Sequence, residues 1–344
     1  MRLGLVLGYS GRTLSLNMDL VKHAENLGFE SVWTSEAYGS DAISPAAYVL
    51  AQTTRIKAGT AIMQMPGRAP TMAAMTAISL NHLSGGRFIV GLGPSGPQVV
   101  EGWYGASYAK PLTRLREYID IMRQVFAREA PVQYDGFHYQ LPYRGEGSTG
   151  LGKSLKCTLH NQHEIPIYTA TLKPKALETS AEIADGFFPI WMNPSRFDLF
   201  EEPIKKGLAK AGKTLSQFDV APFVTVIMGD DVAACRMPVK AMMSLYIGGM
   251  GARGKNFYTT YASQMGYEEE ALHVQDLYLA GKKQEAMNAI PDALVDEVAL
   301  VGPAARIRER ITPWLEAGKK NHVGSMLLGA GQPEALSLIA ELVG

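Results

Sequence analysis

Two side chains of this sequence are placed where they could move a proton. Glu36 closely follows the predicted strand 30–34, and Tyr9 directly follows the predicted strand 3–8. Burial can tune the pKa of a carboxylate toward neutrality, and a phenol can donate a hydrogen bond to a substrate. We therefore take Glu36 as a candidate for proton transfer or for holding the polar edge of a ligand, and Tyr9 as a candidate donor. The structural alternatives are an ion pair between Glu36 and a loop Arg or Lys, and a packing role for the Tyr9 ring.

A glycine-rich segment ends another predicted strand. It reads GGRFIVGLGPSGPQ over residues 85–98, and we take its residues Gly93, Ser95 and Gly96 as candidates for binding a cofactor. Glycine has no Cβ, so a flat and bulky ligand can approach the backbone there. By itself the segment predicts a pocket and no particular chemistry.

A turn that precedes a predicted helix could bind an anion. It reads TATLKPK over residues 169–175 and leads into a predicted helix that begins at Pro174. Unpaired N–H groups and the helix dipole favour a phosphate at such a position, and lysines add positive charge. Ordinary solvated lysines are the alternative. The candidate binding residues of this turn are Thr169, Ala170, Thr171, Leu172, Lys173, Pro174 and Lys175.

Several other chemistries lack their signatures in this sequence. It has no HExxH motif, no cluster of metal-ligating residues and no GxSxG nucleophile turn. The strand ends offer apolar surface, a turn that could bind a phosphate, and few acidic or basic side chains. Such a site suits a cofactor that supplies its own reactive group, such as a flavin. We therefore predict no metal.

Eight short apolar segments alternate with amphipathic ones along the chain. Strands of this kind, which lack polar alternation, indicate a parallel sheet that is buried on both faces. Eight units favour an α/β fold of the (β/α)8 TIM-barrel type, with the active site at the carboxyl ends of the strands. An open doubly wound sheet is the rival, but residues 8–11 do not form its GxGxxG turn. The predicted strands are 3–8, 30–34, 56–62, 87–91, 165–170, 186–190, 220–228 and 323–328, and the predicted helices are 14–27, 45–53, 69–83, 111–128, 174–184, 194–211, 303–317 and 333–342.

Three segments interrupt this alternation. Residues 132–141 are predicted to form a surface hairpin, and residues 142–163 a polar loop over one face. Residues 231–300 contain helical patterns and no clear strand, so we expect a helical insertion after the seventh strand. We expect one barrel domain over residues 1–344.

Composition excludes some partners. The 344 residues carry 33 Lys and Arg against 33 Asp and Glu, so the net charge of zero favours neither nucleic acid nor an anionic membrane. The apolar runs are of strand length, and the first residues lead directly into a strand, which leaves no room for a signal peptide. Two isolated cysteines fit a reduced, cytoplasmic setting.

An ordered set of motifs resembles the bacterial-luciferase-like superfamily, in particular its coenzyme F420 (deazaflavin)-dependent branch, which is related to methylenetetrahydromethanopterin reductase. The motifs keep the order and spacing of that family over nearly the whole chain. They are GFESVWTSE at 28–36, GTAI at 59–62, LSGGRF at 83–88 followed by GLG at 91–93, and IADG at 183–186.

The resemblance implies where a cofactor would lie. A ring would rest across the barrel top against the third strand, where a non-prolyl cis peptide maps to Ala61–Ile62. Gln64 could bond to the heteroatoms of that ring, and the cofactor phosphate would lie at residues 171–175. The family also implies a homodimer.

Some positions depart from the family pattern. Residues 172–173 are Leu-Lys, where many relatives have glycine. Residues 36–37 are Glu-Ala and residue 193 is Asn, where sugar-phosphate dehydrogenases carry an Asp-His pair and a phosphate-reading lysine. Luciferase-type oxygenases often have a histidine where this chain has Tyr9 and Ser10. A sugar phosphate is therefore not the expected substrate, and the oxygenase hypothesis is weakened.

Three functions remain open at this point. The first is an oxidoreductase that transfers a hydride between coenzyme F420 and a small organic substrate of unsaturated, carbonyl or imine (pterin-like) type. The second is an FMN-dependent luciferase-like monooxygenase, and the third is a non-catalytic flavin-binding protein. Oxygen discriminates the first two, because reduced FMN reacts with it rapidly and a deazaflavin hardly does.

Overall fold

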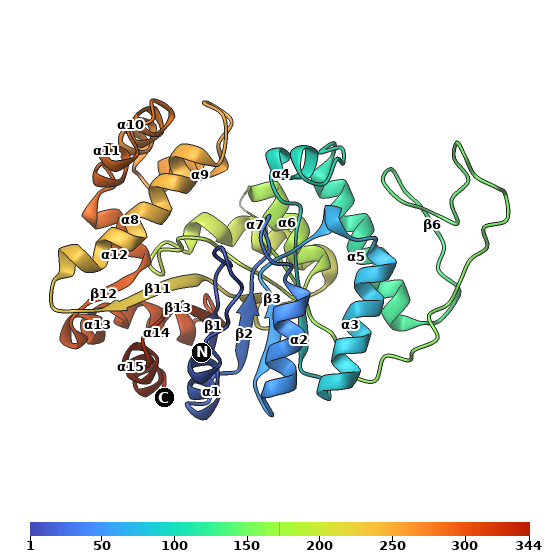
Figure 1. Cartoon of the computed structure of the whole chain (residues 1–344), viewed down its shortest axis with the longest axis horizontal. Coiled ribbons are helices and arrows are strands. Elements are labelled where there is room, and N and C mark those ends of the chain that lie inside the picture. Colours follow the sequence, from blue (N-terminus) through green and yellow to red (C-terminus); the bar gives the residue numbers. More distant parts are fainter. Residues whose placement is uncertain (172) are drawn as a thin grey trace.

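The computed structural model describes residues 1–171 and 173–344, and its centre is a parallel β-barrel (Figure 1). Neighbouring strands pair in parallel register around the barrel, for example Leu5 with Val32 and Leu5 with Leu328. The barrel strands are β1 (Arg2–Val6), β2 (Ser31–Thr34), β3 (Lys57–Thr60), β5 (Phe88–Gly93), β8 (Ile167–Thr169), β9 (Gly186–Phe187), β10 (Asp219–Val220), β11 (Phe223–Met228) and β13 (Ser325–Gly329).

The barrel closes because β10 and β11 are two halves of one extended segment. Only Ala221 and Pro222 separate them. The first half pairs with β9, through Val220 and Phe187, and the second half pairs with β13. Each of the eight predicted strands therefore has its counterpart, and the predicted TIM-barrel fold is confirmed.

Amphipathic helices cover the outside of the barrel, as the sequence predicts. The helix before the glycine-rich strand ends at Gly85, whose φ of 66° is the left-handed conformation that glycine adopts at helix ends. These helices are α1 (Met18–Asn26), α2 (Ile43–Gln52), α3 (Pro70–Ser84), α5 (Pro111–Ala127), α6 (Pro174–Ile183), α7 (Asp198–Ala211), α13 (Ala304–Arg310), α14 (Thr312–Lys319) and α15 (Pro333–Val343).

Aromatic side chains fill the barrel interior. The Trp33 ring lies 5.0 Å from Phe188 and 5.5 Å from Tyr168, measured between ring centroids. A Cβ added to Gly59 would lie 2.4 Å from the Trp33 ring, so glycine on β3 makes room for the indole. Because the interior is packed, we look for a ligand site at the carboxyl ends of the barrel strands.

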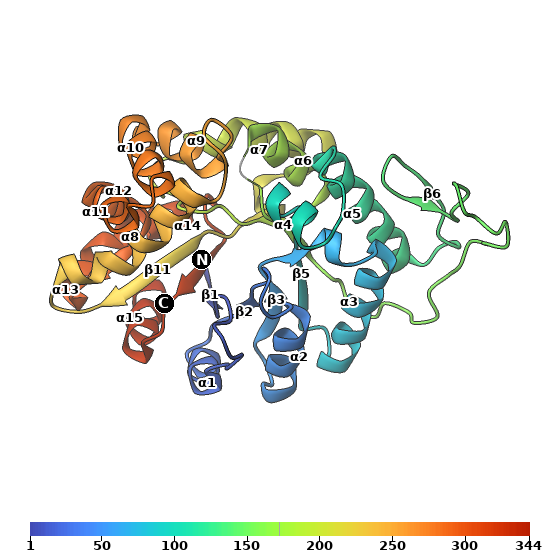
Figure 2. The ribbon, with the colours of Figure 1, turned by 45° about the horizontal axis from the view of Figure 1, so that its top comes forward.

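The predicted hairpin is present as β6 (Tyr134–Asp135) paired antiparallel with β7 (Gln140–Leu141). A buried carboxylate on α5, that of Glu117, accepts hydrogen bonds from the backbone N–H groups of residues 137–139. The hairpin and the loop after it project away from the barrel (Figures 1 and 2).

The expected insertion after the seventh strand is helical and forms one group beside the barrel (Figure 2). Its helices are α8 (Val232–Gly249), α9 (Phe257–Gln264), α10 (Glu268–Leu279), α11 (Lys283–Asn288) and α12 (Asp292–Val298). No helix among the described residues is long and apolar enough to cross a membrane.

The sequence analysis missed several short elements. Strand β12 (Leu300–Gly302) pairs with the end of β11, although residues 231–300 show no clear strand pattern. Runs of two or three paired residues are too short to show a period. The other missed elements are β4 (Met63–Gln64), α4 (Pro97–Gly102) and the 3-10 turns η1 (Met65–Gly67) and η2 (Leu215–Gln217).

Candidate active site

Partly exposed apolar side chains lie on top of the barrel interior. They pack against the inner aromatic cluster, and they come from segments far apart in the sequence. A flat apolar ring could rest on these side chains because all of them are apolar. We call this set of side chains the apolar floor, and it consists of Val6, Ala61, Ile62, Ala170 and Phe223.

The segment after β3 forms one side of this floor. The Ala61–Ile62 peptide bond is cis, as the family resemblance implies. Gly93 lies beside it at the end of β5, and a Cβ there would approach the Ile62 side chain to 2.2 Å. Any larger residue at position 93 would clash with the Ile62 side chain. The sequence analysis did not predict this packing role for Gly93.

A threonine hydroxyl holds β3 to β5 just below the floor. The Thr60 Oγ1 donates to the carbonyl oxygen of Gly91 at 2.8 Å and accepts the Gly91 N–H at 2.9 Å. Thr60 is fully buried. The hydroxyl thus joins the two strands at the point where β3 ends.

Glu36 lies in a buried ion pair. Arg68 Nη1 donates to Glu36 Oε1 at 2.9 Å, and Arg68 Nη2 donates to Oε2 at 2.9 Å. The backbone N–H groups of Gln64 and Ala42 donate to the same two oxygens at 3.0 and 2.9 Å. Burial lowers the pKa of Arg68, but the hydrogen bonds and charge of Glu36 outweigh it and raise the pKa. The geometry therefore favours the alternative considered for Glu36, an ion pair with a loop arginine, over proton transfer.

Gln64 has an unused acceptor. Its Nε2 donates to the backbone oxygen of Glu36 at 3.1 Å, which fixes the orientation of the amide. Its Oε1 is buried and has no hydrogen-bond partner among the described residues. A buried acceptor without a partner is costly, so this atom calls for a donor from a ligand.

Only some side chains of the turn at residues 169–175 are free to contact a ligand. Thr169 is fully buried, and its hydroxyl has no partner in the described part of the chain. The Thr171 hydroxyl is also buried and accepts from Ser180 at 3.3 Å. Since Tyr168 and Ala170 pack on the barrel interior, the intervening Thr169 side chain faces the opposite side of the strand. Direct contact of Thr169 with a ligand on the floor is therefore not supported.

The two lysines of that turn already have partners. Lys173 Nζ lies 4.5 Å from the centre of the Phe257 ring on α9, and Lys175 Nζ lies 3.0 Å from Glu178. Hydrogen bonds from Lys210 and Lys175 lower the pKa of Glu178 to about 2. Helix α6 begins at Pro174, and no side chain caps its first turn among the described residues. Leu172 lies outside the described residues.

The loop after β5 borders the site. Ser95 has a φ of 61°, and both Ser95 and Gly96 are half-buried before α4. Behind them, Tyr104 packs on Gly67, where a Cβ would lie 2.9 Å from its ring. Burial raises the pKa of Tyr104, with Glu36 as the next cause, so the phenol stays protonated.

An aromatic cluster that the sequence analysis missed borders the other side. Tyr9 is 61% exposed, and its hydroxyl oxygen lies 3.5 Å from that of Tyr246 on α8. The Tyr246 ring packs edge-on against Tyr258, at 4.8 Å, and near Trp191, at 5.9 Å. The sequence did not indicate that the tyrosines of the insertion lie near the site. No local pattern shows that α8 and α9 pack beside the ends of the barrel strands.

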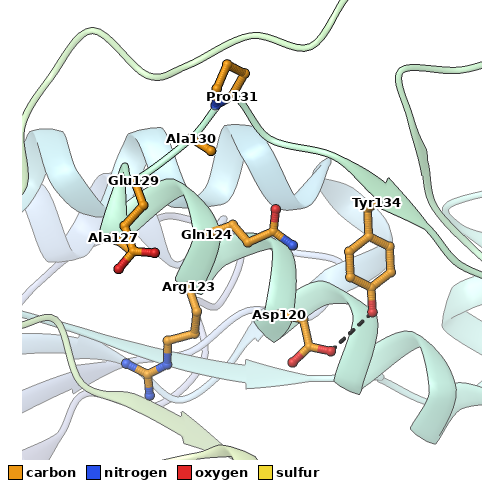
Figure 3. Close-up of a pocket in the computed structure, with 8 residues that line it drawn as sticks. All are labelled: Asp120, Arg123, Gln124, Ala127, Glu129, Ala130, Pro131 and Tyr134. Atoms are coloured by element: carbon orange, nitrogen blue, oxygen red, sulfur yellow. Dashed lines mark hydrogen bonds between the residues drawn. The ribbon is translucent and has the colours of Figure 1, made fainter.

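A separate hollow lies on the outer surface and is unconnected with the strand ends (Figure 3). It has a volume of about 490 Å³ and lies between α5 and residues 129–134. Tyr134 donates to Asp120 there at 3.1 Å, and Arg123 turns away to pair with Asp185 at 2.6 Å. The described residues hold no group of three or more His, Cys, Asp or Glu side chains that could bind a metal.

A barrel with an apolar floor at its strand ends defines a class, the (β/α)8 enzymes with a ligand at the barrel top. The solved structure of the coenzyme F420-dependent tetrahydromethanopterin reductase of Methanopyrus kandleri has this fold. It covers 99% of this chain and 97% of its own, with a TM-score of 0.78 at 22% identity. The model of the family described as luciferase-like monooxygenase matches residues 2–320. The chain therefore belongs to the luciferase-like monooxygenase family and is an oxidoreductase.

Two relatives are similar over almost their full length. A Mycobacterium tuberculosis protein that is provisionally named a coenzyme F420-dependent oxidoreductase is 45% identical, over 100% of this chain and 99% of its own. The 5,10-methylenetetrahydromethanopterin reductase of Archaeoglobus fulgidus is 27% identical, over 93% of this chain and 92% of its own.

Proposed function

We propose that this protein uses coenzyme F420 to transfer a hydride to or from a small organic substrate with an unsaturated, carbonyl or imine group. The 45% identity to a relative named for coenzyme F420 supports the cofactor. The similarity to reductases of a pterin substrate supports the imine-like class. The observation that carries the proposal is the unpaired acceptor Oε1 of Gln64, which lies two residues after Ile62 of the apolar floor.

The residues present fit a deazaflavin ring. Its apolar faces match the floor, and its imide N–H is the kind of donor that the buried Gln64 Oε1 requires. The first turn of α6, with its uncapped N–H groups, suits the phosphate of the side chain. When bound and reduced, the cofactor supplies the hydride.

The residues of the chain orient the reactants and exclude water in this scheme. Gln64 is held by Glu36, which in turn is held by Arg68, so we assign Glu36 and Arg68 a positioning role. Ala61, Ile62 and Ala170 would hold one face of a bound ring and so would orient the cofactor for hydride transfer.

The test is a binding titration of the purified apo-protein with coenzyme F420 and separately with FMN. We expect tight binding of the deazaflavin and a loss of about fivefold in Gln64→Met, which removes the acceptor, since one hydrogen bond contributes about 1 kcal/mol. Gln52→Met, at an exposed position on α2, is the matched control. Preference for FMN would favour the monooxygenase, and binding of neither would refute the cofactor site.

We also propose that the protein is a cytoplasmic homodimer. Exposed apolar side chains on α2 and α3, those of Tyr48, Met72, Met75 and Leu83, support an interface on that face. Light scattering of the purified protein gives the mass directly, and a monomer at micromolar concentration would refute the dimer.

A further inference from the structure

The substrate side of the site is aromatic and comes largely from the insertion. Helix α8 brings Tyr246 to Tyr9, which lies three residues after the end of β1, and α9 adds Tyr258. Tyr258 also lies 5.7 Å from Trp191, which follows β9. The cluster therefore joins the inserted helices to two barrel strands, β1 and β9, on one side of the apolar floor.

One buried donor of this cluster, the indole N–H of Trp191, lacks an acceptor, and a second, the Tyr246 hydroxyl, has one long contact. Trp191 is 3% exposed, and its Nε1 has no hydrogen-bond partner among the described residues. The only side-chain contact recorded for the Tyr246 hydroxyl within the described ranges is the Tyr9 hydroxyl at 3.5 Å. Buried donors without acceptors are rare, so the cluster calls for a ligand that carries an acceptor atom.

We propose that Tyr246 is a catalytic residue that donates a proton to the carbonyl oxygen or imine nitrogen of the substrate, and that Tyr9 relays a proton from solvent to Tyr246. This inference rests on the proposed function. Tyr246 is half-buried among aromatic rings, whereas Tyr9 is 61% exposed, so only Tyr9 is in open contact with water.

The proton and electron balance closes with these residues. Reduction adds a hydride to the substrate carbon, and the electron pair of the C=O or C=N bond moves to the heteroatom. The Tyr246 O–H bond breaks as the new bond to that heteroatom forms, and Tyr9 and solvent restore the phenol. The reduced deazaflavin of the proposed function is the two-electron reductant. Burial, followed by the neighbouring Tyr9, raises the pKa of Tyr246, so the phenol carries its proton at neutral pH.

The first test measures binding without turnover. Benzamide carries a carbonyl acceptor on a flat ring, and its binding to the apo-protein can be followed by tryptophan fluorescence. We expect Tyr246→Phe to weaken binding about tenfold, because one hydrogen bond is lost, while Tyr9→Phe changes it less than twofold. Tyr143→Phe, in the exposed loop after β7, is the matched control. Absence of benzamide binding, or equal binding by Tyr246→Phe, would overturn the proposal.

The second test measures turnover with F420 and a panel of small ketones and cyclic imines. We expect Tyr246→Phe to lower kcat about 100-fold with little change in KM, as loss of a general acid does. Tyr9→Phe should lower kcat less and reduce its solvent isotope effect. Equal kcat in wild type and Tyr246→Phe would contradict the role. If wild type fails to bind F420, the proposed function falls, and the benzamide titration still decides on Tyr246.

Discussion

At the scale of single residues, the candidate site depends on side chains that hold other groups in place. Glu36 and Arg68 form a two-point ion pair whose side chains are 3% and 20% exposed. The pair fixes Gln64, whose side-chain Oε1 is a buried acceptor without a partner among the described residues. A buried pair contributes little when intact compared with two apolar residues, but it is costly to break.

Glu36→Gln should therefore act on stability and cofactor affinity together. It leaves Arg68 with only Asp41, 3.8 Å away, as a charged partner, and we expect a loss of about 3 kcal/mol in the free energy of unfolding. Urea unfolding and F420 titration measure the two effects. Glu182→Gln, in the more exposed pair with Arg116, should cost less than about 1 kcal/mol. If Glu36→Gln folds and binds normally but loses kcat, Glu36 is a proton donor after all.

Thr60→Val tests the link between β3 and β5. The two side chains have the same shape, so the change removes only the two hydrogen bonds to Gly91 and leaves its N–H and C=O groups short of partners. Buried groups of this kind cost about 1–3 kcal/mol, and we expect a loss in that range in the urea unfolding of the variant. The neighbouring Ala61–Ile62 segment should shift, so F420 affinity should also fall. Thr260→Val, on the exposed side of α9, is the control.

At the scale of elements, the inserted helices are attached to the barrel by a charge cluster. Asp296 on α12 accepts from Arg236 of α8 at 3.0 and 2.6 Å, and Arg306 of α13 lies 2.8 Å from the same carboxylate. The side chains of Arg236 and Asp296 are each 16% exposed, so solvent screens this pair only weakly. The orientation of α8, and with it the position of Tyr246, depends on this cluster.

The cluster gives stability a dependence on pH. Burial raises the pKa of Asp296, but hydrogen bonds from Arg236 and Arg306 outweigh it and lower the pKa below its usual value. Its contribution is therefore complete above the unfolded pKa of about 4 and is lost as the pH falls below it. We expect Asp296→Asn to have a lower melting temperature than wild type at pH 7. At pH 3 the difference in melting temperature between the two proteins should be smaller. Asp198→Asn, in an exposed pair with Arg196, should change neither.

The sequence predicted the long elements well and the site only in part. Glycine and apolar runs marked strand 87–91 and helix 111–128 closely, because β5 spans Phe88–Gly93 and α5 spans Pro111–Ala127. The partner of Glu36 could not be identified, since Arg68 lies 32 residues further along and beside a short 3-10 turn. Tyr246 was missed for the same reason, because its position depends on how a 70-residue insertion packs rather than on any local pattern.

At the scale of the whole molecule, a buried carboxylate ties four barrel strands together at the end opposite the site. Asp219 on β10 accepts from Tyr168 of β8 at 2.8 Å and from Ser325 of β13 at 2.6 Å. Arg2 of β1 lies 2.7 Å from the same oxygen. Since β10 and β11 together close the barrel, this network supports the closure where β9 and β10 pair through only two residues each.

Asp219→Asn should therefore destabilise the whole barrel. The neutral amide weakens two hydrogen bonds and one ion pair at the same buried oxygen. Losing one hydrogen bond to a charged group costs about 1.5–3 kcal/mol, and these contacts are weakened and not lost, so we expect a total of about 3 kcal/mol in urea unfolding. Tyr168→Phe removes one donor and should cost about half as much. Asp230→Asn, at an exposed position beyond β11, is the control. F420 affinity of the folded fraction should stay unchanged, because the network lies at the far end of the barrel. Loss of affinity without loss of stability would mean that the two ends are coupled.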